Sequence, residues 1–246
     1  MRMRKKPNLA ARMEKCAHLL VGRPELLRGR WLDPANESPG CLTCQSQRLF
    51  PDKNQSLSCD GPNESGYSEL YIELGCGKGR FTIETAKAAT APAVESGSLF
   101  VALEKSADAM IIAVERAAAE DLQNVRFINV FADDLTDYFA PGEVSRIYLN
   151  FCDPWPSNRH AKRRLTNRRF LEFYLQVLKP GGEVHFKTDN FPLFEYSLQE
   201  FEYAGFALKE TVRDLHKDGP VGVMTDYEQK FHAQGLPIYK CIARKN

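Results

Sequence analysis

Residues 73–79, Glu-Leu-Gly-Cys-Gly-Lys-Gly, have the composition and spacing of a ligand-binding turn. Three glycines, Gly75, Gly77 and Gly79, let the backbone turn sharply and approach a ligand with no Cβ in the way. Glu73 lies two residues before the first of them, and its carboxylate suits a cation better than a phosphate. The sulfonium and amino groups of S-adenosylmethionine meet this requirement, whereas the dinucleotide fingerprint needs a later glycine that this chain lacks. A tight strand-to-helix connection without a ligand is the alternative.

Glu104 ends a second apolar run, residues 99–104, about thirty residues after the glycine turn. In doubly wound folds, a carboxylate at this place accepts hydrogen bonds from ribose hydroxyls. The alternative is a carboxylate that caps the following helix. Because the glycine turn lies upstream, the ribose contact is the favoured interpretation.

A third segment, residues 150–156, has the sequence Asn-Phe-Cys-Asp-Pro-Trp-Pro and follows the fourth predicted strand. The carboxyl ends of parallel strands face the ligand crevice of a doubly wound sheet, so this segment is expected beside the glycine turn. Trp155 offers a flat face, and Asp153 is expected where a methyl acceptor must sit. We therefore predict that Asp153 presents its carboxylate at the cofactor edge of the sheet. A rigid structural loop with a packed tryptophan is the alternative.

A basic run begins three residues after that segment. Its members are Arg159, His160, Lys162, Arg163 and Arg164. Cationic side chains at this place could hold the phosphates of a nucleic acid close to the reacting centre. The first thirty residues add nine Lys or Arg against two Glu, on a chain whose formal net charge is only +1. Two such patches favour a polyanionic partner, and a solvated surface is the alternative for either one alone.

Two further polar segments are placed to rim the same crevice. Residues 187–190, Lys-Thr-Asp-Asn, end the fifth predicted strand, and residues 224–228, Met-Thr-Asp-Tyr-Glu, lie in a late loop. Their carboxylates and hydroxyls, among them Asp189, Thr225 and Glu228, are candidates for contacts with a substrate.

The pattern that must position these residues alternates apolar runs of strand length with amphipathic helical stretches. The predicted strands are residues 70–74, 99–104, 125–130, 147–151, 183–187, 206–214 and 237–243. The predicted helices are residues 80–89, 106–120, 166–178 and 192–204, the third of them ended by the Lys-Pro-Gly-Gly turn at 179–182. This order predicts an α/β fold: a doubly wound, Rossmann-like sheet of parallel strands with a C-terminal antiparallel hairpin.

Composition sets limits on the domain organisation. With 246 residues, of which 43% are hydrophobic and 26% charged, the chain can bury a full core without disulfides. Residues 33–68 are rich in small and polar residues, so we expect an insertion between a basic N-terminal extension, residues 1–32, and the main domain, residues 69–246. Its cysteines, Cys41, Cys44 and Cys59, are one ligand short of a structural zinc site, so no metal is expected.

The chain has no apolar stretch that approaches the ~20 residues of a membrane span, and its basic start lacks the apolar core of a signal peptide. We therefore expect a cytoplasmic protein with reduced thiols and no membrane partner. The sequence leaves a monomer and a homodimer both open.

Five motifs together closely resemble the bacterial tRNA (guanine-N(7)-)-methyltransferases. They lie at residues 73–79, 150–156, 159–164, 185–190 (His-Phe-Lys-Thr-Asp-Asn) and 225–228 (Thr-x-x-Glu). The likeness runs from residue 69 to the C-terminus and includes residues 1–7. It implies a class I methyltransferase that moves a methyl group from S-adenosylmethionine to nitrogen 7 of a guanosine in the tRNA variable loop. The partner would then be tRNA.

The resemblance also implies roles for single residues. The cofactor site would be lined by Glu73, Gly75, Gly77, Gly79, Glu104, Asp133 and Asp153. Substrate contacts would come from Ser157, Asp189, Thr225 and Glu228, and RNA contacts from the basic run. Three features depart from the family: two single positions and the length of the insertion at residues 33–68, which is longer than expected. Phe131 stands where an aspartate near the adenine is usual, which leaves Asp133 and Asp134 as candidates, and Ser157 replaces a lysine.

The chemistry expected from this resemblance is undemanding, because nitrogen 7 of guanine has an exposed lone pair and no proton to remove. Alignment and electrostatic stabilisation matter more than a base, and Asp153 would stabilise the positive charge that the purine gains. Three alternatives stay open: a methyltransferase for another RNA or a small molecule, a non-catalytic RNA-binding protein on this fold, and, least favoured, a nicotinamide oxidoreductase.

Overall fold

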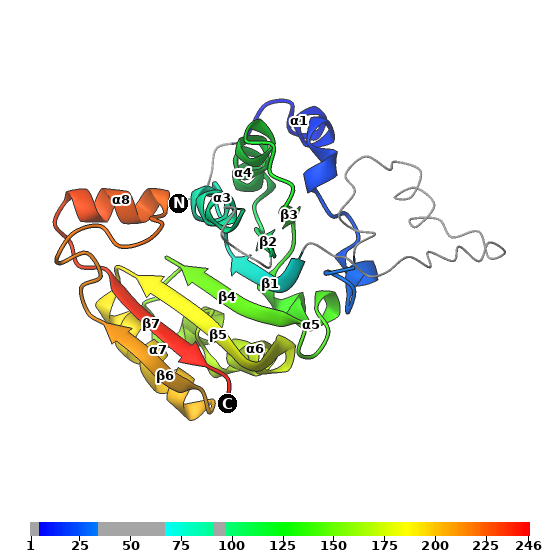
Figure 1. Ribbon diagram of the computed structural model, residues 1–246. Helices are drawn as coiled ribbons and strands as arrows, with labels where there is room; N and C mark the ends of the chain where they lie inside the picture. The colour runs from blue at the N-terminus through cyan, green and yellow to red at the C-terminus, as the bar shows by residue number, and fades with distance from the viewer. Residues whose placement is uncertain (1–4, 34–66, 91–96) are drawn as a thin grey trace.

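The computed structural model describes residues 5–33, 67–90 and 97–246, and in them seven strands form one twisted sheet (Figure 1). The strands lie in the order β3-β2-β1-β4-β5-β7-β6. Their bounds are β1 Tyr67–Leu74, β2 Gly97–Leu103, β3 Val125–Ile128, β4 Val144–Asn150, β5 Leu178–Thr188, β6 Ala207–Val212 and β7 Tyr239–Arg244. The first five are parallel, and β7 runs antiparallel to both β5 and β6. The predicted doubly wound sheet with a C-terminal hairpin is confirmed.

Helices cover both faces of this sheet (Figure 1). They are α1 Leu9–Lys15, α3 Arg80–Ala89, α4 Ala107–Ala119, α5 Leu135–Tyr138, α6 Arg168–Val177, α7 Phe191–Tyr203 and α8 Asp226–Ala233. Contacts pair α3 with α4 and α6 with α7. None of the helices in the described ranges is long and apolar enough to cross a membrane.

The strands β2 and β3 are buried along nearly their whole length, because both faces of the sheet are covered there. Along β2, Val101 and Leu103 belong to the hydrophobic cluster that includes Phe170 of α6. The intervening residues, Phe100 and Ala102, belong to the cluster on the α3 and α4 side. Two hydrophobic cores therefore lie on opposite faces of the sheet. Because successive side chains of a strand point to opposite faces, alternate residues of β2 belong to alternate cores.

Two local predictions differ from the structure. Helix α6 ends before the segment 179–182, as predicted, but this segment lies within β5 and is not a separate turn. The register with β4 shifts there, from the pair Val144–Leu178 to the pair Arg146–Glu183. The late loop contains a helix, α8, that the sequence analysis did not predict. Thr225 and Glu228 form a capping box at its start, so a motif assigned to substrate contact also begins a helix.

The N-terminal segment lies against the domain and is not a detached extension. Arg12 of α1 makes a bidentate ion pair with Glu115 of α4, both bonds 2.7 Å long. Trp31 is almost fully buried, with its ring stacked 5.3 Å from that of Phe139. The segment thereby contributes a large aromatic side chain to the core. Residues 34–66 of the predicted insertion, with its three cysteines, lie outside the described residues, and residues 67 and 68 belong to β1.

Replacing Trp31 by alanine is expected to cost about 3–5 kcal/mol of stability, because the change empties a buried aromatic site. Trp31→Phe, which keeps a ring and loses the 2.8 Å hydrogen bond from Nε1 to the Tyr138 carbonyl, is expected to lose less. Urea denaturation of the three proteins measures the difference. An unchanged midpoint in Trp31→Ala would show that the N-terminal segment does not stabilise the domain.

Candidate functional site

The carboxylate of Glu73 lies at the carboxyl end of β1, between β2 and β4. It is buried, and burial raises its pKa, against hydrogen bonds from Asn150 and Thr82 that lower it. Asn150 Nδ2, at the end of β4, donates to one oxygen over 2.9 Å, and the Thr82 hydroxyl, from α3, donates to the other. One side chain thus joins two strands and a helix at the point where the strand order reverses, which is where doubly wound sheets bind ligands.

Asn150 carries an acceptor that the protein does not use. Its Oδ1 atom is buried and has no hydrogen-bond partner within the described residues. A buried carbonyl oxygen without a partner costs about 1–3 kcal/mol, so such an atom beside Glu73 indicates a donor supplied by a ligand. An ammonium group can donate hydrogen bonds both to Asn150 Oδ1 and to the neighbouring Glu73 carboxylate.

The backbone amides of the glycine turn donate hydrogen bonds to acceptors within the protein. Gly75 and Cys76 both donate to the Leu103 carbonyl, over 2.8 and 3.1 Å, and Gly79 donates to Cys76 over 2.9 Å. Gly77 donates to Oε2 of Glu104 over 3.0 Å. These amides are not free for a phosphate, which agrees with the interpretation of the turn as a site for a cation.

The residue type at position 79 is also limited by the close approach of α3 and α4. The φ of Gly79 is +76°, and a Cβ built there would overlap the Cβ of Ala113 and lie 3.0 Å from that residue's Cα. The last glycine of the turn therefore serves helix packing, as the third glycine of dinucleotide-binding turns does.

Glu104 accepts a hydrogen bond at the start of the following helix, and its contact with a ribose stays a prediction. It is buried, and its Oε1 atom accepts a 2.8 Å hydrogen bond from the Ser106 amide at the start of α4. Its Oε2 atom accepts from Gly77. Since a carboxylate has about four acceptor positions, two remain for the hydroxyls of a ribose.

The loop after β4 is held in an unusual backbone conformation. Phe151 and Trp155 have φ angles of +53° and +43°, which bulky residues adopt at a cost of about 1–3 kcal/mol each. Asp153 lies between them and is exposed, with its carboxylate 3.7 Å from the Lys105 ammonium that follows β2. The loop therefore carries Asp153 across the end of β1, to the side of Glu104.

The basic run divides into two parts. Four side chains of the 3₁₀ turn Asn158–Arg163 are exposed, as an RNA contact requires. They are Arg159, His160, Lys162 and Arg163. Arg164 is buried instead, and its guanidinium donates to the carbonyls of Pro154 and Trp155. Its donors are directed at the loop, a placement different from the RNA contact expected from the sequence.

The remaining predicted cofactor residue, Asp133, forms an ion pair with Arg169 of α6. Asp134 lies 3.5 Å from the Tyr138 hydroxyl, and Phe131 is 60% exposed just after β3. The Asp134 amide lies 3.5 Å from the Phe131 carbonyl, and a cofactor contact by Asp133 stays a prediction.

The predicted substrate residues lie on the rim and beneath it. Ser157 and Asp189 are exposed. Glu228 is fully buried: it accepts from Lys187 Nζ over 2.6 Å and lies 2.9 Å from His216 Nε2. Because the Val221 amide donates to His216 Nδ1, the proton of the neutral imidazole is on Nε2. Through the bond from Lys187, Glu228 links α8 to β5. Its direct contact with a substrate stays a prediction.

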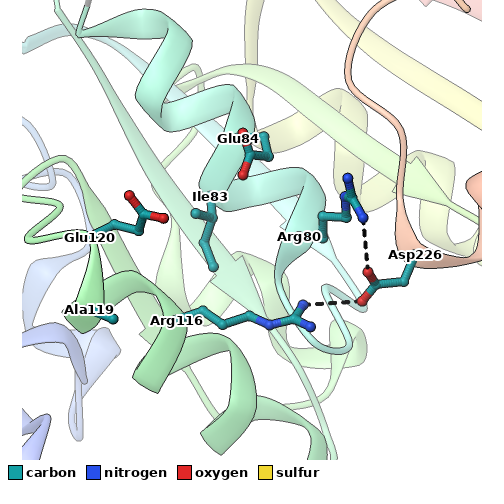
Figure 2. A pocket seen from close by; sticks show the side chains of 7 residues that line it. All are labelled: Arg80, Ile83, Glu84, Arg116, Ala119, Glu120 and Asp226. Carbon is teal, nitrogen blue, oxygen red and sulfur yellow. Dashed lines mark hydrogen bonds and ion pairs between the residues drawn. The ribbon is translucent and has the colours of Figure 1, made fainter.

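Helix α8 is also fastened to the helices of the glycine turn. Figure 2 shows Asp226 between Arg80 of α3 and Arg116 of α4. The Asp226 carboxylate lies 3.6 Å from the Arg80 guanidinium and 3.1 Å from the Arg116 guanidinium. These three side chains line a pocket of about 290 Å³. Arg116 also donates to the Lys78 carbonyl over 3.1 Å. The late segment and the glycine turn are therefore held together. Asp226 lies within the segment 224–228 that the sequence placed near a substrate, whereas Arg116 was not singled out.

Comparison with known proteins gives the following likenesses. The family described as "Putative methyltransferase" matches residues 68–241. A tRNA (guanine-N(7)-)-methyltransferase of Geobacillus sp. (strain WCH70) is 40% identical over 98% of this chain and 94% of its own. Among solved structures, the 16S rRNA methyltransferase KamB aligns with a TM-score of 0.57 at 16% identity, over 74% of this chain and 90% of that one. An Aquifex aeolicus SAM-dependent methyltransferase aligns with a TM-score of 0.51 at 14% identity, over 73% and 84%.

Gly79→Ala is expected to destabilise the protein by about 1–3 kcal/mol beyond its backbone strain, because the new methyl group overlaps Ala113. Gly222→Ala is the matched control, since Gly222 also has a positive φ, +66°, but open space around it. Adding Ala113→Gly to Gly79→Ala is expected to restore part of the loss. Equal denaturation midpoints for the two alanine variants would contradict the packing role.

Proposed function

Since the chain belongs to the tRNA (guanine-N(7)-)-methyltransferase family, we propose that it transfers a methyl group from S-adenosylmethionine to nitrogen 7 of a guanosine in the variable loop of tRNA. The observation that carries the proposal is the carboxyl edge of the sheet, where Glu73 lies at the end of β1, Glu104 follows β2 and the Asp153 loop follows β4. An enzyme of this class acts where tRNA is found, which favours the cytoplasm.

The residues at the crevice fit the proposed cofactor. The Glu73 carboxylate and the unpartnered Asn150 Oδ1 suit the ammonium of its methionine part. The two free acceptor positions of Glu104 suit the ribose hydroxyls. When bound, S-adenosylmethionine supplies a methyl group on a positively charged sulfur.

The protein's part in the reaction is alignment and charge stabilisation. Nitrogen 7 of guanine attacks without losing a proton, so the chain has no proton to take at that atom. Holding the two partners in line can supply on the order of 7–11 kcal/mol. The purine ring becomes cationic as the bond forms, and the carboxylate of Asp153, carried at the mouth of the crevice, stabilises that charge.

The charged surface supports tRNA as the acceptor. The exposed residues Arg159, His160, Lys162 and Arg163 directly follow the Asp153 loop. The basic N-terminal segment reaches the same edge, because the Lys6 amide donates to Asp108 in the first turn of α4, over 2.7 Å. A methyltransferase for a small molecule would have no use for cations on two sides of the crevice.

The experiment that tests the function is methyl transfer from labelled S-adenosylmethionine to unmodified tRNA, followed by nucleoside analysis. The proposal predicts 7-methylguanosine as the labelled product. Cofactor binding without transfer would indicate another RNA or a small acceptor, and the absence of cofactor binding would favour a non-catalytic RNA-binding protein.

Asp153→Ala is expected to lower kcat by about 10²–10³-fold, the usual effect of removing one group that stabilises transition-state charge. Asp153 is exposed, so circular dichroism and the denaturation midpoint are expected to match those of the wild type. Asp153→Asn, which keeps the shape and loses the charge, separates electrostatics from packing and is expected to lose nearly as much. Wild-type turnover in either variant contradicts the assignment.

A further inference from the structure

Arg164 differs from its basic neighbours in where its guanidinium points. The four preceding members of the run, three cations and His160, are exposed, whereas Arg164 is only 8% exposed. Nothing in the sequence separates it from Arg163, since both belong to one uninterrupted basic segment. The difference arises because the 3₁₀ turn Asn158–Arg163 ends just before Arg164 and directs its side chain back under the loop.

The contacts of Arg164 are all made to the loop that carries Asp153 or to the scaffold beneath it. Nε donates to the Pro154 carbonyl over 3.1 Å, and Nη2 donates to the Trp155 carbonyl over 3.0 Å. The guanidinium carbon lies 4.3 Å from the centre of the Tyr196 ring of α7. These carbonyls belong to the two residues that immediately follow Asp153.

The support beneath Arg164 is itself fixed. The Tyr196 hydroxyl accepts a 2.6 Å hydrogen bond from Nδ2 of Asn167, and Asn167 in turn caps helix α6. Helices α6 and α7 therefore hold the ring on which the guanidinium rests. A planar fork of donors can reach two carbonyls while stacking on a ring, and an ammonium cannot do all three.

The loop needs such a support, because Trp155 has a φ of +43° that its own side chain disfavours. Bonds to the Pro154 and Trp155 carbonyls, one on each side of the Trp155 α-carbon, fix the backbone direction there. That direction decides where Asp153, one residue earlier, presents its carboxylate.

We propose that Arg164 is a positioning residue for methyl transfer: resting on Tyr196, it fixes the Pro154 and Trp155 carbonyls and so sets Asp153 at the mouth of the crevice. The proposal rests on the proposed function for its reaction. It separates the basic run into cations that bind RNA and one cation that holds the loop.

The test compares Arg164→Lys with Lys162→Met in steady-state methylation of tRNA and in tRNA binding across salt concentrations. Arg164→Lys keeps the charge and loses the fork, so kcat is expected to fall on the order of 100-fold, with the tRNA dissociation constant and its salt slope unchanged. Lys162→Met is expected to weaken tRNA binding and to reduce the salt slope by about one.

A spectroscopic measurement reports the loop itself. In a Trp31→Phe background, Trp155 is the one remaining tryptophan of the chain. Its emission is expected to shift in Arg164→Lys and to stay unchanged in Lys162→Met. If Arg164→Lys does not fold, Tyr196→Leu, which removes the supporting ring, replaces it with the same expected fall in kcat and the same emission shift.

Two results would overturn the proposal. One is a folded Arg164→Lys protein whose loss lies in tRNA affinity and salt slope, as for Lys162→Met. The other is wild-type kcat and unchanged Trp155 emission. Failure of the wild-type protein to form 7-methylguanosine would refute the proposed function instead, and the emission of Trp155 would still decide whether Arg164 holds the loop.

Discussion

A carboxylate buried at the end of a parallel strand must be hydrogen-bonded, and the partners that Glu73 finds decide the shape of the crevice. Thr82 brings the first turns of α3 onto β1, and Asn150 brings the end of β4 beside it. Burial raises the pKa of Glu73, and the nearby charge of Lys187 opposes that rise. A cationic ligand beside this group would pair with a charge that the protein alone leaves poorly solvated.

The elements around Glu73 are fixed by different means. The glycine turn is fixed by its own amides and by Glu104, so that the backbone is set before any ligand binds. The Asp153 loop adopts disfavoured backbone angles and needs support from outside, which Arg164 supplies. The late segment is held by the buried pair of Lys187 and Glu228, within a site where burial lowers the lysine's pKa. Preorganisation of this kind suits a reaction that depends on alignment.

The sequence predicted the parallel sheet and helix α3 well, because apolar runs, helical periodicity and the glycine turn all indicate the same structure. It did not predict α8, since Thr-x-x-Glu is compatible with a capping box and with a binding motif alike. Arg164 could not be told from Arg163, because a sequence gives charge but not the direction of a side chain. The unpartnered oxygen of Asn150 becomes visible only when its neighbours are in place.

The most direct test of the account uses a tRNA transcript in which 7-deazaguanosine replaces guanosine. This base lacks the nitrogen that we propose as the acceptor and keeps the rest of the guanine edge. The account predicts that the protein labels the ordinary transcript with the methyl group of S-adenosylmethionine and leaves the 7-deaza transcript unlabelled, while binding both. Equal labelling of the two transcripts would contradict it, because the methyl group would then reside on another atom.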